Sequence, residues 1–131
     1  PTTYMNLSGK AFKYWMDKEK LEPSQTLTIV DDLALPLNKM RLRGSGSDAG
    51  HNGLKDIQLM LGTDVYPKLR FGIGNQFPKG GQVDFVLGKW LPSEQPVIAQ
   101  KIDKSIEMIE SFAAIGLDRT MTICNALNFE I

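Results

Sequence analysis

A strand, a loop and a helix follow one another in the stretch Lys39-Met40-Arg41-Leu42-Arg43-Gly44-Ser45-Gly46-Ser47-Asp48-Ala49-Gly50 and its continuation to Gly62. Basic and apolar side chains alternate over residues 39–43, which predicts a strand with one buried and one basic face. The composition of residues 44–50 is typical of a loop. Leu54, Ile57 and Leu61 then recur at helical spacing, and Gly62 ends the pattern.

The segments around this stretch continue the alternation of helices and strands. On the N-terminal side, Ser8 to Lys20 predicts an amphipathic helix whose first turn Ser8 caps, and Thr26 to Val30 predicts a short buried strand. On the C-terminal side, Lys68 to Ile73 predicts a further strand, and an apolar run from Val83 to Leu87 follows a turn. Three or four short strands are few for a complete sheet.

The longest predicted element is a helix from about Ser93 to Gly116, and a short helix capped by Asp118 follows it to about Asn128. Apolar residues at helical spacing form the stripe of the long helix that we expect to be buried: Ile98, Ile102, Ile106, Ile109 and Phe112. Strands that alternate with helices predict an α/β fold in which helices cover a β-sheet. The length of 131 residues predicts a single domain, residues 1–131.

The composition narrows the classes of function. Cys124 is the only cysteine, so no intrachain disulfide forms, and a single cysteine with a single histidine cannot supply the usual ligands of a zinc site. We therefore expect no metal and no cofactor. No apolar run approaches the roughly 18 residues of a membrane span, and a lone thiol is typical of a reducing compartment. We expect a cytoplasmic protein without membrane contact.

The net charge is zero, but the charges are unevenly distributed. Residues 39–70 hold six basic and three acidic side chains, whereas residues 84–131 hold four basic and seven acidic ones. A basic face on the middle of the chain favours local contact with phosphates, and a mixed solvated surface is the alternative.

The glycine-rich loop Gly44-Ser45-Gly46-Ser47-Asp48-Ala49 matches the pattern of dinucleotide-binding folds, and Asp64 follows about twenty residues later. The context disfavours this function, because the preceding strand is amphipathic and Asp64 directly follows a helix instead of ending a strand. A surface loop fits the same residues, as does a loop that admits the sugar–phosphate backbone of a nucleic acid.

Three short polar segments are candidates for a site. Asp31 and Asp32 end a predicted strand, where a carboxylate pair can bind a metal, orient a histidine, share a proton or simply shape a turn. Gly50-His51-Asn52-Gly53 begins a helix and can present donors to an oxygen, or only cap the helix. Tyr4-Met5-Asn6 precedes the first helix and is either part of a site or a turn with core residues.

Five segments, taken together and in order, resemble the bacterial-type peptidyl-tRNA hydrolase family. The segments are Pro1-Thr2-Thr3-Tyr4-Met5-Asn6-Leu7-Ser8-Gly9, Asp31-Asp32-Leu33-Ala34-Leu35-Pro36, Gly50-His51-Asn52-Gly53-Leu54-Lys55-Asp56-Ile57, Leu69-Arg70-Phe71-Gly72-Ile73-Gly74 and Phe85-Val86-Leu87-Gly88-Lys89. The resemblance implies that family's three-layer fold with a mixed sheet, and hydrolysis of the ester between a peptide and its tRNA without a metal.

The resemblance also implies roles for single residues. Asn6 and Asn52 correspond to amides that bind the substrate beside the scissile ester, and Asp31 to the carboxylate that orients the catalytic histidine. Tyr4 and Met5 correspond to part of the wall against the substrate. His51 is also expected among the residues that bind the substrate.

By the same resemblance, Arg43, Lys55 and Arg70 correspond to contacts with tRNA phosphates, with peptidyl-tRNA as the partner. Asp48 stands where the family commonly has a histidine, and a negative charge there weakens phosphate contact.

The largest departure concerns the general base. The family's base is a histidine near the N-terminus, and this sequence has no counterpart of it, because His51 matches another position. We therefore expect a chain that lacks the family's first strands and is inactive or nearly so by itself. Uncovered sheet edges would favour self-association. A non-catalytic tRNA-binding or RNA-binding module with the same fold is the alternative.

Overall fold

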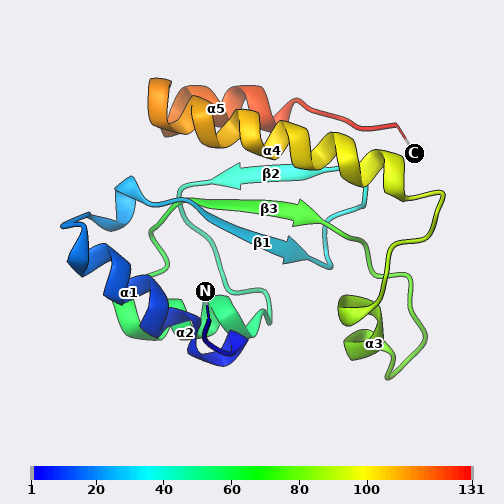
Figure 1. The fold of residues 1–131 in the computed structure, drawn as a ribbon, viewed down its shortest axis with the longest axis horizontal. Helices are drawn as coiled ribbons and strands as arrows, with labels where there is room; N and C mark the ends of the chain where they lie inside the picture. The colour runs from blue at the N-terminus through cyan, green and yellow to red at the C-terminus, as the bar shows by residue number, and fades with distance from the viewer. Residues whose placement is uncertain (1, 131) are drawn as a thin grey trace. The chain divides into compact units, whose positions relative to one another are not determined.

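Three short strands form one mixed sheet in the order β1-β3-β2 in the computed structural model of the chain. The strands are β1 (Thr28–Asp32), β2 (Met40–Arg43) and β3 (Lys68–Gly72). β1 and β3 run in the same direction and β2 runs in the opposite one (Figure 1). The sheet and its helices confirm the predicted α/β class.

The structure describes residues 2–130, so Pro1 of the first matching segment and Ile131 of the predicted domain lie outside the described residues. The helices are α1 (Ser8–Lys18), α2 (Asn52–Leu61), α3 (Gln82–Leu87), α4 (Gln95–Ile115) and α5 (Leu117–Asn125), and the short 3-10 segments are η1 (Met5–Leu7) and η2 (Pro23–Gln25). Within the described residues, none of these helices is both long and apolar enough to cross a membrane.

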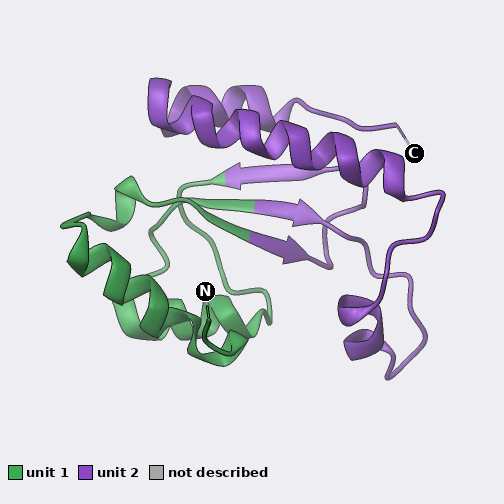
Figure 2. Ribbon diagram, viewed as in Figure 1, with its two compact units in different colours: residues 1–29, 43–69 green, residues 30–42, 70–131 purple. Residues whose placement is uncertain are grey.

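The chain divides into two compact units (Figure 2). Unit 1 consists of residues 1–29 and 43–69 and contains α1 and α2. Unit 2 consists of residues 30–42 and 70–131 and contains α3, α4 and α5. Each unit has its own buried apolar residues.

In unit 1, α1 packs on α2. The Gly9 amide donates to the Asp56 carboxylate (2.7 Å), and Met16, Leu54 and Ile57 are buried. Ser8 does not cap α1 as predicted, because it is the first helical residue and its hydroxyl instead donates to the Met5 carbonyl (2.7 Å). This contact ties α1 back to η1.

In unit 2, residues 35–39 wrap around the end of β3 at Gly72. The Gly72 amide donates to the Lys39 carbonyl (3.1 Å), and a Cβ atom at this glycine would lie 2.1 Å from the Pro36 carbonyl oxygen. Only glycine permits this approach, because any side chain would collide with backbone atoms. The Gly74 amide donates to the Leu35 carbonyl (3.0 Å) and extends the same seam.

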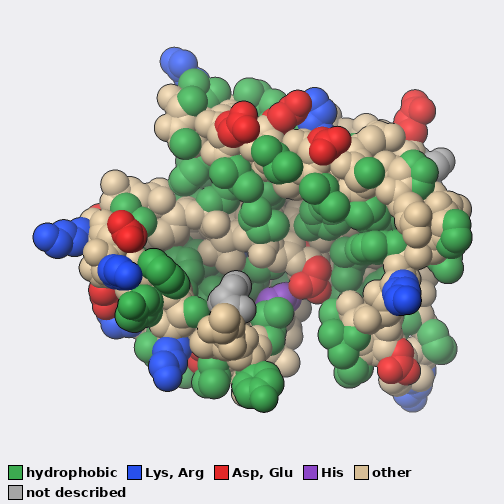
Figure 3. All heavy atoms as spheres, viewed as in Figure 1, with side chains coloured by type: hydrophobic (Ala, Val, Ile, Leu, Met, Phe, Trp, Pro, Cys, Tyr) green, Lys and Arg blue, Asp and Glu red, His purple; other side chains and the backbone are tan. Residues whose placement is uncertain are grey.

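Helix α4 buries Ile98 of the predicted stripe and half-buries Phe112, but the three isoleucines between them are exposed. Its buried residues are Val97, Ile98, Lys101, Ser105 and Met108, whereas Ile102, Ile106 and Ile109 are 50%, 49% and 43% exposed. Hydrophobic and acidic side chains lie together over α4 and α5 on the face shown in Figure 3. The polar residues of the buried face have partners: the Lys101 ammonium donates to backbone carbonyls, and Ser105 donates to the Lys101 carbonyl (2.7 Å).

Two other segments differ from their predictions. β1 begins at Thr28 instead of Thr26, because the amide and hydroxyl of Thr26 both donate to the Pro23 carbonyl and close the η2 turn. The apolar run Val83 to Leu87 lies in helix α3 and adds no strand, so the sheet has three strands within the described residues.

The outer edge of β2 is partly occupied. The Leu42 amide donates to the side-chain oxygen of Asn125 (2.7 Å), and the Asn125 amide group donates to the Leu42 carbonyl (3.0 Å). Asn125 thus bonds to β2 as a neighbouring strand would. Self-association through a sheet edge stays a prediction.

Lys101 makes stability depend on pH in a defined direction. Burial lowers the pKa of Lys101 from 10.5 to about 8, so between these values the unfolded chain binds more protons than the folded one. The free energy of unfolding should therefore rise from pH 8 to pH 10, by at most about 2 kcal/mol from this residue, and by less where solvent screens the charge. Urea unfolding of the wild type and of Lys101→Met across this range measures the difference. Lys104→Met is the control, and parallel curves for wild type and Lys101→Met would contradict the prediction.

Candidate functional site

In unit 1, the η1 segment lies against the beginning of α2. A Cβ atom at Gly53 would lie 2.7 Å from the Met5 sulfur, so the missing side chain of this glycine makes room for Met5. Tyr4 and Met5 are 82% and 57% exposed, and Asn6 beside them is also exposed. The segment that carries Asn6 therefore adjoins the segment that carries Asn52.

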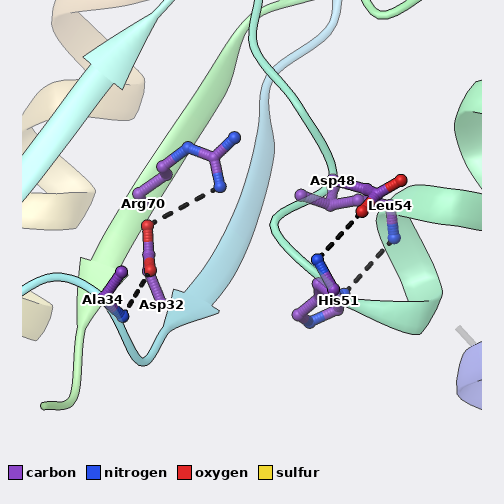
Figure 4. Close-up of polar contacts among 7 residues, drawn as sticks. Asp32, Ala34, Asp48, His51, Leu54 and Arg70 are labelled. Atoms are coloured by element: carbon purple, nitrogen blue, oxygen red, sulfur yellow. Dashed lines mark hydrogen bonds and ion pairs between the residues drawn. The ribbon is translucent and has the colours of Figure 1, made fainter. Parts of the chain in front are cut away.

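His51 is the N-cap of α2. Its Nδ1 accepts hydrogen bonds from the Gly53 amide (3.1 Å) and the Leu54 amide (3.3 Å), as Figure 4 shows for Leu54. Because Nδ1 is the acceptor, the neutral ring carries its proton on Nε2. The capping alternative left open by the sequence is therefore the geometry that the structure has.

Asp48 organises the glycine-rich loop from within. Its side chain accepts from the Gly50 amide (2.9 Å), and its carbonyl accepts from the His51 amide (2.8 Å) (Figure 4). The Asp48 carboxylate thus closes the turn before α2. Gly50 has a φ of 81°, a conformation that favours glycine at this turn.

Three exposed side chains of unit 1, at the N-terminal end of α2 and on β2, can bind an anion. Asn52, the first residue of α2, is exposed beside the positive end of the helix dipole. Arg43 and Lys55 are exposed as well. Asn52 can donate to a developing negative charge, and the two cations can approach phosphates.

The two aspartates at the end of β1 have different surroundings. Asp32 accepts from the Ala34 amide (2.8 Å) and pairs with Arg70, whose guanidinium nitrogen lies 3.6 Å from its carboxylate (Figure 4). The side chains of Arg70 and Asp32 are 10% and 12% exposed, so little of the pair reaches solvent. Asp32 therefore shapes the turn after β1, and Arg70 is not the exposed arginine that a phosphate contact requires.

Asp31 lies on the wall of a cavity of about 980 Å³ within unit 2. Apolar side chains form much of the lining, among them Trp90, Phe85 and Ile73. Charged residues, among them Asp84, Lys89 and Glu94, also belong to the lining. The complete lining is Asp31, Leu33, Ala34, Pro36, Leu37, Ile73, Gly74, Asn75, Gln76, Asp84, Phe85, Val86, Gly88, Lys89, Trp90, Leu91, Ser93 and Glu94.

Sequence reasoning missed this cavity. Its lining comes from three separate segments, residues 31–37, 73–76 and 84–94. Each overlaps one quoted motif, but residues 75–76 and 90–94 lie outside all of them. Two features of the sequence could have indicated a segment without regular structure in this wall. Apolar and polar residues stop alternating after residue 73, and a turn follows at residues 79–80.

The predicted site residues thus fall into two groups. Unit 1 brings Tyr4, Met5 and Asn6 next to His51 and Asn52, and it also carries Arg43 and Lys55. Unit 2 carries Asp31 and Arg70. Within residues 2–130, no three side chains of His, Cys, Asp or Glu gather as metal ligands would.

Comparison with known proteins gives one consistent result. The family profile described as "Peptidyl-tRNA hydrolase" matches residues 1–130. The chain is 51% identical to the peptidyl-tRNA hydrolase of Phocaeicola vulgatus and 50% identical to that of Porphyromonas gingivalis, over 95% of this chain and 67% and 68% of those proteins. It is similar to the crystal structure of peptidyl-tRNA hydrolase from Acinetobacter baumannii, with a TM-score of 0.88 and 30% identity over 98% of this chain and 65% of that one. The chain spans about two thirds of the length of these proteins.

The cap at His51 can be tested by stability. Replacing His51 with Ala should lower the free energy of unfolding by about 1 kcal/mol, because the Gly53 and Leu54 amides lose their acceptor. His51→Asn should retain most of the stability, since asparagine is a preferred N-cap. Urea unfolding measures both variants, and an equal loss for Ala and Asn would argue against capping.

Proposed function

The chain belongs to the peptidyl-tRNA hydrolase family, and on this premise we propose that it binds peptidyl-tRNA at the ester between the peptide and the 3′ ribose and serves its hydrolysis. The observation that carries the proposal is the packing of the η1 segment on the first turn of α2, where the Met5 sulfur occupies the space left by Gly53. This packing brings the segment that carries Asn6 beside the segment that carries Asn52. Both side chains are amides, which can donate hydrogen bonds to the carbonyl oxygen of an ester.

In the proposed reaction, Asn6 and Asn52 bind the carbonyl side of the ester. Water adds to the carbonyl carbon, the carbonyl oxygen becomes negative, and the ribose oxygen leaves with a proton. Side-chain amides donate to that oxygen more strongly as its charge grows, which lowers the barrier. The N-terminal end of α2 adds a favourable dipole, and Tyr4 and Met5 form an exposed wall beside the amides.

Asp31 has the proposed role of orienting an imidazole that takes the proton from water. A carboxylate behind a histidine decides which ring nitrogen carries the proton and stabilises the protonated ring. The single histidine of the sequence, His51, is engaged as the cap of α2. We therefore propose that these 131 residues bind and polarise the substrate but hydrolyse it slowly, because they supply no histidine for Asp31.

The cavity beside Asp31 is the proposed place of the peptide. Its volume of about 980 Å³ accommodates several amino-acid side chains, and its aromatic and aliphatic lining suits apolar residues. Because many different peptides stall on tRNA, a roomy apolar cavity suits the substrate better than a narrow one with many directional donors would.

Arg43 and Lys55 are the proposed contacts to tRNA phosphates. Both side chains are exposed, whereas Arg70 is buried and paired with Asp32, so we leave Arg70 out of the phosphate contacts. A non-catalytic tRNA-binding module is the second candidate. It is favoured by the exposed basic side chains of β2 together with the engagement of His51 as a cap.

The phosphate contacts can be tested by the salt dependence of binding. Replacing Arg43 or Lys55 with Ala should weaken binding of deacylated tRNA and reduce the slope of log affinity against log salt by about one for each contact removed. Filter binding over a range of salt concentrations measures the slope. Lys104→Ala, in unit 2 and paired with Glu107, is the control, and an unchanged slope in the Arg43 and Lys55 variants would remove them from the interface.

The missing general base can be tested by chemical rescue. The chain should hydrolyse N-acetyl-phenylalanyl-tRNA slowly, and free imidazole should raise the rate by about tenfold or more over imidazole without protein. Asp31→Asn, Asn6→Ala and Asn52→Ala should each reduce the rescued rate, whereas Asp103→Asn should not.

Two outcomes would decide between the candidate functions. Fast hydrolysis without imidazole would mean that another residue of the chain acts as the base. Tight tRNA binding with no rescue, and no preference for acylated over deacylated tRNA, would favour the non-catalytic module.

A further inference from the structure

Lys101 is a charged side chain in the interior of unit 2. It lies in the middle of α4 and is completely buried. Its ammonium donates to the Leu37 carbonyl (2.7 Å) and the Gly72 carbonyl (2.5 Å) and lies 4.0 Å from the centre of the Phe71 ring. One side chain of the helix thus binds two segments that are 35 residues apart, at 37 and 72.

Both segments border the cavity that contains Asp31. Leu37 lines the cavity, and Gly72 directly precedes Ile73, which also lines it. Two backbone hydrogen bonds join the same segments, from the Ile73 amide to the Asp32 carbonyl (3.1 Å) and from the Gly74 amide to the Leu35 carbonyl (3.0 Å). The bonds of Lys101 join them again from α4, so the wall is held by its own backbone and by the helix.

The arrangement is poorly explained by stability alone. A buried ammonium loses its hydration, which opposes folding, and burial lowers the pKa of Lys101 to about 8 for this reason. An apolar side chain of similar length would avoid that cost, although it would leave two carbonyls with fewer donors. These two effects on the free energy of unfolding have opposite signs. What a donor at this position adds, and an apolar side chain cannot, is a bond from α4 to both residue 37 and residue 72 beside the backbone bonds that already join the two segments.

We propose that Lys101 is a positioning residue, which holds the segment from Asp31 to Leu37 against the end of β3 and so keeps the cavity wall in the geometry that receives the peptide. The proposal rests on the proposed function for the identity of the ligand, but its structural part concerns the wall alone. In this view, a variant without the donor folds and keeps its tRNA contacts, yet its cavity is loose and it recognises the peptide poorly.

Trp90 provides a reporter inside the cavity. The chain has two tryptophans, and the other, Trp15, lies exposed on α1, so Trp15→Phe leaves Trp90 as the only indole. In this background, Lys101→Met should increase acrylamide quenching of Trp90 by about twofold, because the wall opens to solvent more often. Lys101→Arg retains donors for both carbonyls and should restore most of the protection. Lys104→Met, an exposed lysine of the same helix, should behave as the parent.

The second readout separates the peptide from the tRNA. Affinities for N-acetyl-phenylalanyl-tRNA and for deacylated tRNA are measured in the same variants. Lys101→Met should lose about fivefold to tenfold in affinity for the acylated tRNA and nothing for the deacylated one, since loss of ordered contacts acts only on the peptide. Circular dichroism and urea unfolding identify any variant that fails to fold. If Lys101→Met does not fold, Lys101→Gln takes its place. Glutamine retains a donor amide on a shorter side chain, so the same changes in quenching and affinity are expected with a smaller size.

The outcomes distinguish this proposal from the proposed function. A folded Lys101→Met variant with unchanged Trp90 quenching and unchanged affinity would overturn the positioning role. Increased quenching in a protein whose parent does not discriminate acylated from deacylated tRNA would support the role of Lys101 in the wall and contradict the proposed function. Increased quenching together with selective loss of the acylated tRNA supports both.

Discussion

A buried ammonium and a glycine together hold the interior of unit 2. Lys101 supplies donors to the carbonyls of Leu37 and Gly72, and Gly72 lets residues 35–39 approach the end of β3 closely. Both features are needed. Without the glycine, residues 35–39 would collide with the end of β3, and without the ammonium, two carbonyls would lose a hydrogen-bond donor. The placement of Asp31, the cavity wall and the buried face of α4 all depend on this junction.

Local sequence patterns predicted the elements whose environment is local. The alternation of residues 39–43 predicted β2 correctly, with Met40 and Leu42 buried and Arg41 and Arg43 exposed. The helical spacing after the glycine-rich loop predicted α2, and Gly62 ends it in a left-handed conformation with a φ of 70°. In both elements, the apolar side chains that make up the pattern are buried or half-buried and the polar ones between them are exposed or half-buried, so the periodicity of the sequence was sufficient to predict the element.

Where burial depends on distant partners, local patterns were not sufficient. Of the isoleucine stripe predicted to be buried in α4, only Ile98 is buried. The helix buries Lys101 and Ser105 instead of the other isoleucines, because their polar groups find carbonyl partners that no periodicity reveals. Arg70 was expected to bind phosphate, but its guanidinium pairs with Asp32, 38 positions away. For the site, the motifs located the segments of Asn6, Asn52 and Asp31, while the cavity depended on three separate segments meeting in space. The capping role of His51 stood among the alternatives, and only the positions of the Gly53 and Leu54 amides could select it.

The bond between Asn125 and the edge of β2 has a consequence for the time at which the sheet is completed during protein synthesis. Asn125 lies 83 positions after Leu42, so the ribosome makes β2 well before the side chain that occupies its edge. At elongation rates of about 5 to 20 residues per second, that edge waits on the order of ten seconds for its partner. During this interval, β2 lacks the two hydrogen bonds that the Asn125 side chain supplies.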